Sequence, residues 1–242
     1  MNLFVYISVF LSIVISGMSV LLIKINQKSL KLILSFSGAY LFAISVLHLI
    51  PEIYSDGDSS VGYFILAGFL FQILMEFFSE GIEHGHIHVH NHGKHEHAFP
   101  FTMMIALSVH SFLEGMPLAG NFSGHHGESG NNQLLAGIIL HNIPIAIALM
   151  IMLTQSHIKK QTAVFWLLVF ALMTPMGTLT AQLIGDNLLQ ITGNFNKLMG
   201  VVVGIFLHIS TTILFESSEN HRFNLIKFLV ILFGCGVALI HF

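Results

Sequence analysis

The chain has 242 residues, of which 54% are hydrophobic and 9% are charged, and its mean hydropathy is +0.80. Because soluble domains carry about a quarter charged residues, this composition excludes an ordinary soluble protein and indicates an integral membrane protein embedded in a lipid bilayer. The single cysteine, Cys235, excludes an intrachain disulfide and a thiolate metal cluster, and the net charge of −3 gives no reason to expect a nucleic-acid partner.

Apolar runs of about 20 residues can each cross a bilayer as a helix. The runs lack the alternation of barrel strands, and a backbone in lipid must satisfy its own hydrogen bonds. Lysines follow the first run instead of preceding it, so we expect a spanning helix there and not a signal peptide. We predict an all-α polytopic membrane protein, a single transmembrane domain over residues 1–242 with eight spanning helices: 3–23, 32–52, 61–80, 99–120, 133–154, 162–184, 197–216 and 224–242.

The basic residues divide unequally between the two sides of this predicted bundle. Only Lys197 falls in a connection from an even-numbered to an odd-numbered helix. The positive-inside rule makes the opposite side cytoplasmic, which places both termini outside the cytoplasm of an inner or plasma membrane. The other positive charges are Lys24, Lys28, Lys31, Lys94, Lys159, Lys160, Arg222 and Lys227.

A histidine-rich cytoplasmic loop, residues 84–97, is predicted between the third and fourth helices. Such a tract binds metal loosely through alternative ligand sets, and the alternative is a solvated polar linker. On the outer side, His125 and His126 offer either a weak capture site or an ordinary loop. The histidines of the long loop are His84, His86, His88, His90, His92, His95 and His97.

Ionisable residues in the middle of apolar helices are functional candidates, because burying them in lipid is costly. His110 and Glu114 are four residues apart and so share one helix face. The next helix carries His141 and Asn142 in a similar local pattern, His followed by a small polar residue, as in His110–Ser111. If the two polar faces meet, two imidazoles and one carboxylate could hold zinc with one position open. The alternative is a hydrogen-bonded pair that only joins two helices.

Other polar residues lie nearer the helix ends. His48 and Glu52 are again four residues apart, at the outer boundary, where an entrance site and an interfacial cap are equally good interpretations. His208 sits in the middle of the seventh helix, and Glu216 near its cytoplasmic end could serve an exit path. We expect the glutamates at the end of the third helix to form a solvated rim: Glu76, Glu80 and Glu83.

Three prolines interrupt the backbone hydrogen bonding of the central helices. Pro117, Pro144 and Pro175 should free the carbonyls four residues earlier. Broken helices near mid-membrane often form transporter sites, although prolines are also simply tolerated in membrane helices.

Several of these segments resemble the Zrt/Irt-like (ZIP) metal transporter family. "HSFLEG" resembles its fourth-helix pattern, His-Asn-x-x-Asp/Glu-Gly, and "HNIPIA" resembles its fifth-helix pattern; "HLIPE" and "TPMG" resemble segments of helices two and six. The resemblance implies inverted repeats, with helices one, four, five and six moving against two, three, seven and eight. It also implies a two-metal centre, with His110, Glu114 and His141 matching ligands of the first metal.

The chain departs from the family pattern at the second metal. Ser111, Asn142 and Thr174 occupy positions where that metal would find Asn, Asp and Glu, and Ile145 stands where many members have a bridging Glu, or a His. Hydroxyls and one amide are weak ligands, so we predict one metal site. Its neutral imidazoles favour borderline ions such as Zn²⁺ over hard ions such as Mg²⁺, and metal uptake should weaken as the histidines become protonated at low pH.

We therefore predict a divalent-metal transporter and not an enzyme, carrying Zn²⁺ into the cytoplasm, with Fe²⁺, Mn²⁺ and Cd²⁺ as alternative cargoes. The alternatives are a homologue that senses metal without transporting it, and a membrane-embedded zinc hydrolase. The hydrolase is disfavoured because the chain has no H-E-x-x-H motif. Small residues such as Gly38 and Gly68 allow close helix packing, either within one chain or in a homodimer.

Overall fold

The computed structural model describes residues 3–79, 101–119, 127–156, 158–184, 195–215 and 224–239. Within these ranges all regular structure is helical, which confirms the predicted all-α class. In chain order the helices are α1 (Leu3–Ser19), α2 (Gln27–Ile44), the π-helix η1 (Ser45–Leu49), α3 (Ile50–Ile53), α4 (Val61–Ser79), α5 (Phe101–Gly115), the 3₁₀ helix η3 (Met116–Ala119), α6 (Gly127–Gln155), α7 (Lys160–Ile184), α9 (Phe195–Phe215) and α10 (Leu225–Leu239).

Six helical segments of the described chain are long and apolar enough to cross a bilayer, which identifies an integral membrane protein. They are Gln27–Ile53, Val61–Ser79, Phe101–Ala119, Asn132–Gln155, Lys160–Ile184 and Phe195–Phe215. The predicted first and last spans correspond to shorter apolar helices, α1 with 17 residues and α10 with 15. The predicted span 133–154 agrees with Asn132–Gln155, and helix α6 itself begins earlier, at Gly127.

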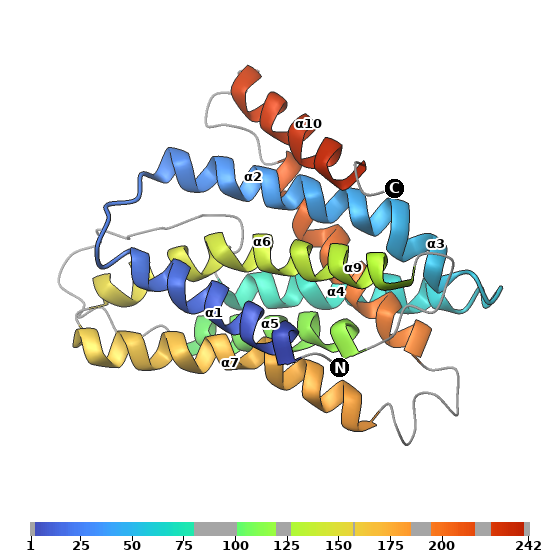
Figure 1. Ribbon diagram of the computed structural model, residues 1–242, viewed down its shortest axis with the longest axis horizontal. Helices are drawn as coiled ribbons and strands as arrows, with labels where there is room; N and C mark the ends of the chain where they lie inside the picture. Colours follow the sequence, from blue (N-terminus) through green and yellow to red (C-terminus); the bar gives the residue numbers. More distant parts are fainter. Residues whose placement is uncertain are drawn as a thin grey trace.

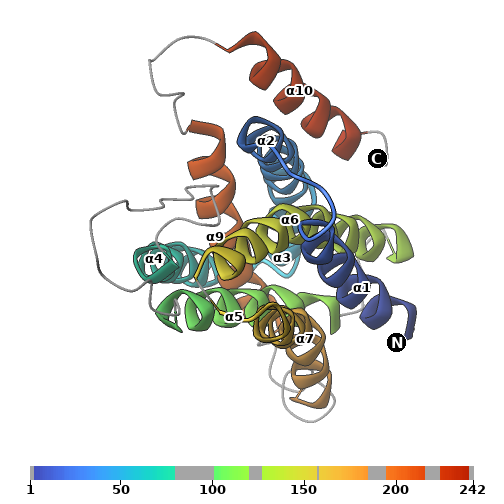
Figure 2. The same ribbon diagram turned by 90° about the vertical axis from the view of Figure 1, so that its left-hand side faces the viewer.

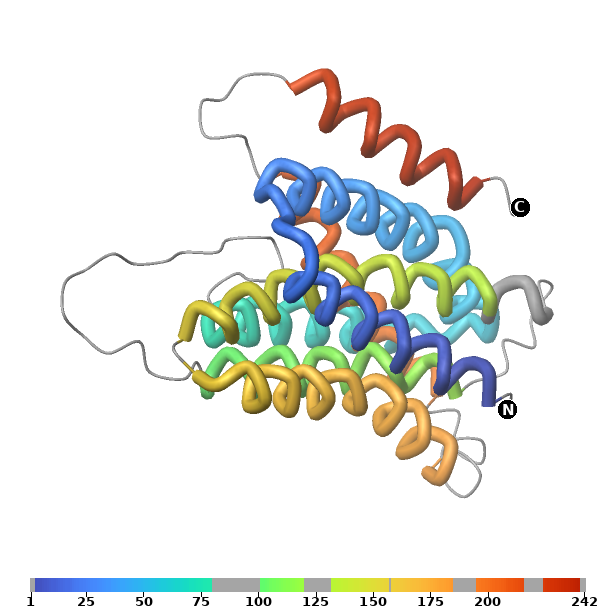
Figure 3. The backbone as a smooth tube through the Cα atoms, turned by 60° about the vertical axis from the view of Figure 1, so that its left-hand side comes forward, coloured from blue at the N-terminus to red at the C-terminus, as the bar shows by residue number. Residues whose placement is uncertain are grey.

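Helix α6 forms the centre of the bundle, and nine of the ten side chains from His141 to Met150 are buried, as expected for a helix that is apolar on all sides. It packs against α1, α2 and α7, while α5 packs against α7 and α4 against α9 (Figures 1 and 2). Helix α10 packs along α2 at one edge. The start of α1 and the end of α10 lie at the same end of the bundle, opposite the α1–α2 and α6–α7 links (Figure 3).

The prolines have smaller effects on the helices than the sequence suggests. Pro144 and Pro175 lie inside the continuous helices α6 and α7, so neither interrupts its helix. Pro117 falls in η3, where α5 has already given way to a 3₁₀ turn. Pro51 lies two residues after the end of the π-helix η1, whose C-cap residue Ile50 donates its N–H to the Ser45 carbonyl. A wide turn of this kind accommodates the hydrogen bond that a proline cannot make.

Glycines let α4 and α9 approach to backbone contact. A methyl group on Gly68 of α4 would meet the Val201 carbonyl of α9, and one on Gly204 would meet the Ile65 carbonyl. Gly38 of α2 instead makes room for the side chain of Ile213 on α9. These small residues therefore serve packing within the chain, where close backbone approach replaces the missing hydrophobic drive between helices in lipid.

Candidate metal centre

Helix α5 presents two adjacent polar faces to two different neighbours. His110 and Glu114 share one face and Ser111 and Gly115 the other, as the spacing of four residues requires. His110 and Glu114 are fully buried, and the His110 Nε2 atom lies 3.4 Å from Glu114 Oε2. A buried imidazole and carboxylate at this distance form a preformed pair of electron-rich groups inside an apolar bundle.

The third ionisable group comes from α6, as the sequence suggested it could. His141 is also fully buried, and its ring meets the His110 ring edge to face, with centroids 5.9 Å apart. One ligand atom from each of His110, Glu114 and His141 lies within 4.8 Å of the others, and no other described His, Cys, Asp or Glu joins them in such a group. A metal ion bound by three such atoms would lie about 2.0–2.2 Å from each, so the most widely separated ligand atoms would have to move closer together on binding.

Asn142 adds an amide to the same cluster. Its side chain is fully buried, and its Nδ2 atom donates a hydrogen bond to Glu114 Oε1 at 3.2 Å. His141 and Asn142 therefore both face α5 from consecutive positions of α6. One carboxylate oxygen of Glu114 therefore accepts a hydrogen bond from Asn142, and the other lies near His110.

The other polar face of α5 contacts α7. Ser111 Oγ and Thr174 Oγ1 are hydrogen-bonded to each other at 2.7 Å, and both side chains are fully buried. Ile145, one turn after His141 on α6, is fully buried as well. Where the family resemblance would place ligands of a second metal, this chain has a closed hydroxyl pair and an apolar side chain.

Sequence reasoning missed what holds α5 against α7. A methyl group on Gly115 would meet the Thr174 carbonyl, and one on Gly177 would meet the Phe112 carbonyl, so the two backbones touch. Thr178 Oγ1 bridges them by donating to the carbonyl of Gly115 at 2.7 Å and to that of Thr174 at 3.0 Å. The small-residue spacing Ser111-x-x-x-Gly115 was the available signal for this close contact.

The outer pair His48 and Glu52 lies apart from the three-residue group. His48 sits in the π-helix η1 and Glu52 in α3, and both side chains are partly buried. π-Helical turns are common at functional sites. An entrance role for these two residues stays a prediction.

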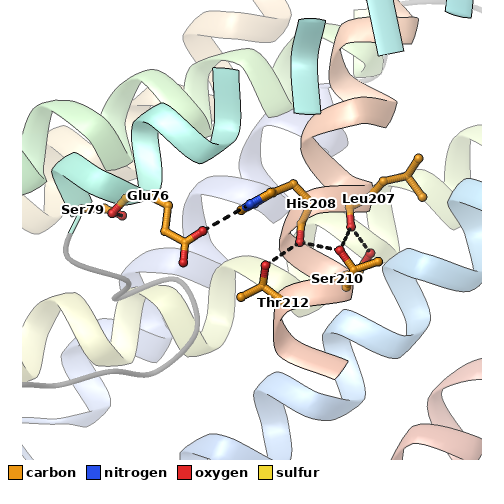
Figure 4. Close-up of polar contacts among 7 residues, drawn as sticks. Glu76, Ser79, Leu207, His208, Ser210 and Thr212 are labelled. Carbon is orange, nitrogen blue, oxygen red and sulfur yellow. Dashed lines mark hydrogen bonds and ion pairs between the residues drawn. The ribbon is translucent and has the colours of Figure 1, made fainter. Parts of the chain in front are cut away.

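His208 also lies apart from the group, and its neighbour is a residue that the sequence suggested was solvated. Its Nε2 atom is 3.3 Å from Glu76 Oε2, which links α9 to α4 (Figure 4). Phe69 packs edge-on against the His208 ring. Because the Glu76 side chain is only 29% exposed, a solvated rim is the wrong description of this residue.

Several predicted residues fall outside the described part of the chain. They are Glu216, the rim glutamates Glu80 and Glu83, the outer-loop histidines His125 and His126, and the whole histidine-rich loop over residues 84–97.

Comparison with known proteins places the described site within a recognised family. A stretch of 149 residues is 31% identical to Protein zntD of Dictyostelium discoideum, covering 58% of this chain and 21% of that protein. A stretch of 122 residues is 29% identical to a protein of Arabidopsis thaliana named "Putative zinc transporter", covering 50% of this chain and 19% of that protein. The chain thus matches only about a fifth of the length of either relative.

The family match covers α5 to α10 and with them every residue of the buried cluster. Residues 99–241 match the family described as ZIP Zinc transporter. This family consists of transporters and not of enzymes. The motifs of α5 and α6, the helical membrane fold and this match agree, and the chain belongs to the ZIP zinc transporter family.

Proposed function

We propose that this protein carries divalent metal ions, with zinc preferred, across a cell membrane toward the cytoplasm. The observation that carries this proposal is the buried group of His110, Glu114 and His141, whose ligand atoms lie within 4.8 Å of one another. Two imidazoles and one carboxylate from the protein, with a fourth position left for water, form the donor set of exchangeable zinc sites. Hard ions such as Mg²⁺ prefer all-oxygen sites and should bind poorly.

The proposed arrangement in the membrane is the one that the resemblance to the ZIP family implies. Eight helices would span the bilayer as one transmembrane domain, with both termini outside the cytoplasm and an inverted repeat relating the two halves. Helices α1, α5, α6 and α7 of the first unit pack among themselves, and two of them also contact the second unit, through α2 with α6 and α4 with α5. Since α5 and α6 carry the cluster, movement of the first unit against the second would expose the bound ion to alternate sides. A homodimer stays a prediction.

The path of the ion would begin at His48 and Glu52 and end at the cytoplasmic side. Glu216 and the histidine-rich loop over residues 84–97 would receive the released ion there, and the loop would buffer or sense it. The positive charges of the α1–α2 and α6–α7 links mark that side by the positive-inside rule.

Zinc uptake by the purified full-length chain in proteoliposomes tests this function. Radioactive ⁶⁵Zn²⁺ should accumulate inside vesicles that contain the protein, faster than in protein-free vesicles, and should stay inside after external chelation. Metal binding without such accumulation would contradict transport and would instead identify a metal-sensing homologue.

We further propose that the centre holds one ion. The hydroxyls of Ser111 and Thr174 bond directly to each other at 2.7 Å, which leaves no room for a metal between them. Ile145 supplies no ligand atom at the position where a carboxylate could bridge two ions.

Restoring a carboxylate should create a second binding position. Ile145 lies four residues after His141 on α6, on the same face of the helix. We expect Ile145→Glu to raise bound zinc from one to about two ions per chain, because a buried carboxylate is stabilised by a bound cation. Metal analysis of the purified protein measures this. The neutral control Ile145→Gln should keep one ion, and an unchanged stoichiometry in Ile145→Glu would count against the positional match.

A further inference from the structure

Only one of the two polar atoms of the Asn142 side-chain amide has a hydrogen-bond partner among the described residues. Its Nδ2 atom donates to Glu114 Oε1 at 3.2 Å. Its Oδ1 atom is buried and accepts no hydrogen bond within the part of the chain that the structure describes. A buried amide oxygen without a donor costs about 1–3 kcal/mol, so such an atom calls for a specific explanation.

Chemistry fixes which way this amide points. Glu114 must be ionised to bind a metal, so if the amide oxygen and nitrogen of Asn142 exchanged places, two acceptors, Asn142 Oδ1 and Glu114 Oε1, would face each other without a proton between them. The amino group must therefore face the carboxylate. Covalent geometry then keeps Oδ1 beside the buried cluster, because both atoms are bonded to the same carbon.

The two oxygens of Glu114 have different partners. Oε2 lies 3.4 Å from His110 Nε2, a candidate ligand atom, whereas Oε1 accepts a hydrogen bond from the amide of Asn142. An ion entering between His110, Glu114 and His141 would meet Oε2. The hydrogen bond from Asn142 would keep Oε1 turned away and so restrict Glu114 to one-oxygen ligation. Partners of this kind, which hold a ligand in place, commonly set metal affinity and geometry.

We propose that Asn142 is a positioning residue that fixes the geometry of the bound ion, a different role from the metal ligand that its position would be in a two-metal centre. Its Nδ2 atom limits Glu114 to one oxygen, and its Oδ1 atom accepts a hydrogen bond from the water that fills the fourth position of the cargo ion. This proposal rests on the function proposed above. It makes the site selective for ions that accept four ligands, such as Zn²⁺ and Co²⁺, over ions that require six.

Cobalt absorption spectroscopy of the purified full-length protein tests this role, because four-coordinate Co²⁺ absorbs visible light far more strongly than five- or six-coordinate Co²⁺. The wild type should show the strong four-coordinate bands. Asn142→Leu removes both ends of the amide, and we expect about 10–100-fold weaker Co²⁺ binding and a severalfold lower band intensity, as Glu114 becomes free to bind through both oxygens. Asn142→Asp keeps the acceptor and loses the donor, so it should lower the band intensity without weakening binding.

The control is Ser37→Ala, which also removes a buried polar group. Ser37 Oγ donates to the carbonyl of Leu34 in its own helix, α2, so the Co²⁺ spectrum and affinity of this variant should equal those of the wild type. Wild-type bands and affinity in both Asn142 variants would overturn the positioning role while leaving the metal centre intact. Absence of any Co²⁺ binding by the wild type would instead contradict the proposed function itself.

Discussion

Replacing either histidine of the buried cluster is expected to abolish metal transport. In His141→Ala or His110→Ala the ion keeps one imidazole and one carboxylate, which cannot complete a four-coordinate site inside an apolar bundle. Losing a residue that only supports a ligand costs about 10–100-fold in affinity, so losing a ligand should cost at least about 100-fold. Equilibrium zinc binding and ⁶⁵Zn²⁺ uptake in proteoliposomes measure both effects.

A variant that creates a cavity beside the same helix, α6, provides the matched control. Leu149→Ala truncates another fully buried side chain of α6 but removes no ligand atom. This variant should retain zinc affinity within about threefold if it folds, since its cost falls on packing and not on coordination. Uptake at the wild-type rate in both histidine variants would remove these residues from the transport path.

The second large effect concerns the contact between α5 and α7. Gly177→Ala would place a methyl group against the Phe112 carbonyl, well inside van der Waals distance, and backbone cannot move aside as a flexible side chain can. Overpacking of this kind costs about 1–3 kcal/mol or more. For a chain of this size we expect the melting temperature in detergent to fall by roughly 5–10 °C, together with loss of zinc binding as α5 shifts.

Gly236→Ala is the control for that experiment. Gly236 also lies in a helix, α10, but a methyl group there would meet no atom within 4 Å. Alanine favours a helix over glycine by about 0.5–1 kcal/mol, so this variant should be as stable as the wild type or slightly more stable. Equal melting temperatures of Gly177→Ala and Gly236→Ala would show that the α5–α7 contact is looser than described.

The sequence alone predicts the helical class and the approximate spans, because runs of apolar residues in a bilayer leave the backbone few alternatives. It also predicts that His110 and Glu114 share a face, since only helix periodicity is needed. The meeting of His141 with them required an assumption about how α5 packs on α6, and the structure provides that packing. The periodicity of residues within one helix does not determine how that helix is rotated about its own axis relative to a neighbouring helix.

Contacts between distant segments account for most of what the sequence does not reveal. Glu76 lies near a helix end and was expected in solvent, but α9 crosses α4 closely enough for His208 to reach it. Thr178 carries no metal-site signature, and its bridging role appears only once the backbones of α5 and α7 touch at Gly115 and Gly177. Such contacts depend on crossing positions, which one sequence does not specify.

Anomalous X-ray scattering from crystals grown with zinc would test the single-ion centre most directly. One zinc peak per chain is expected in the cluster, within about 2.0–2.2 Å of ligand atoms from each of His110, Glu114 and His141. The Ser111–Thr174 hydroxyl pair should remain closed beside it. Two zinc peaks in the cluster, or a peak elsewhere in the bundle with these three residues unoccupied, would contradict this account.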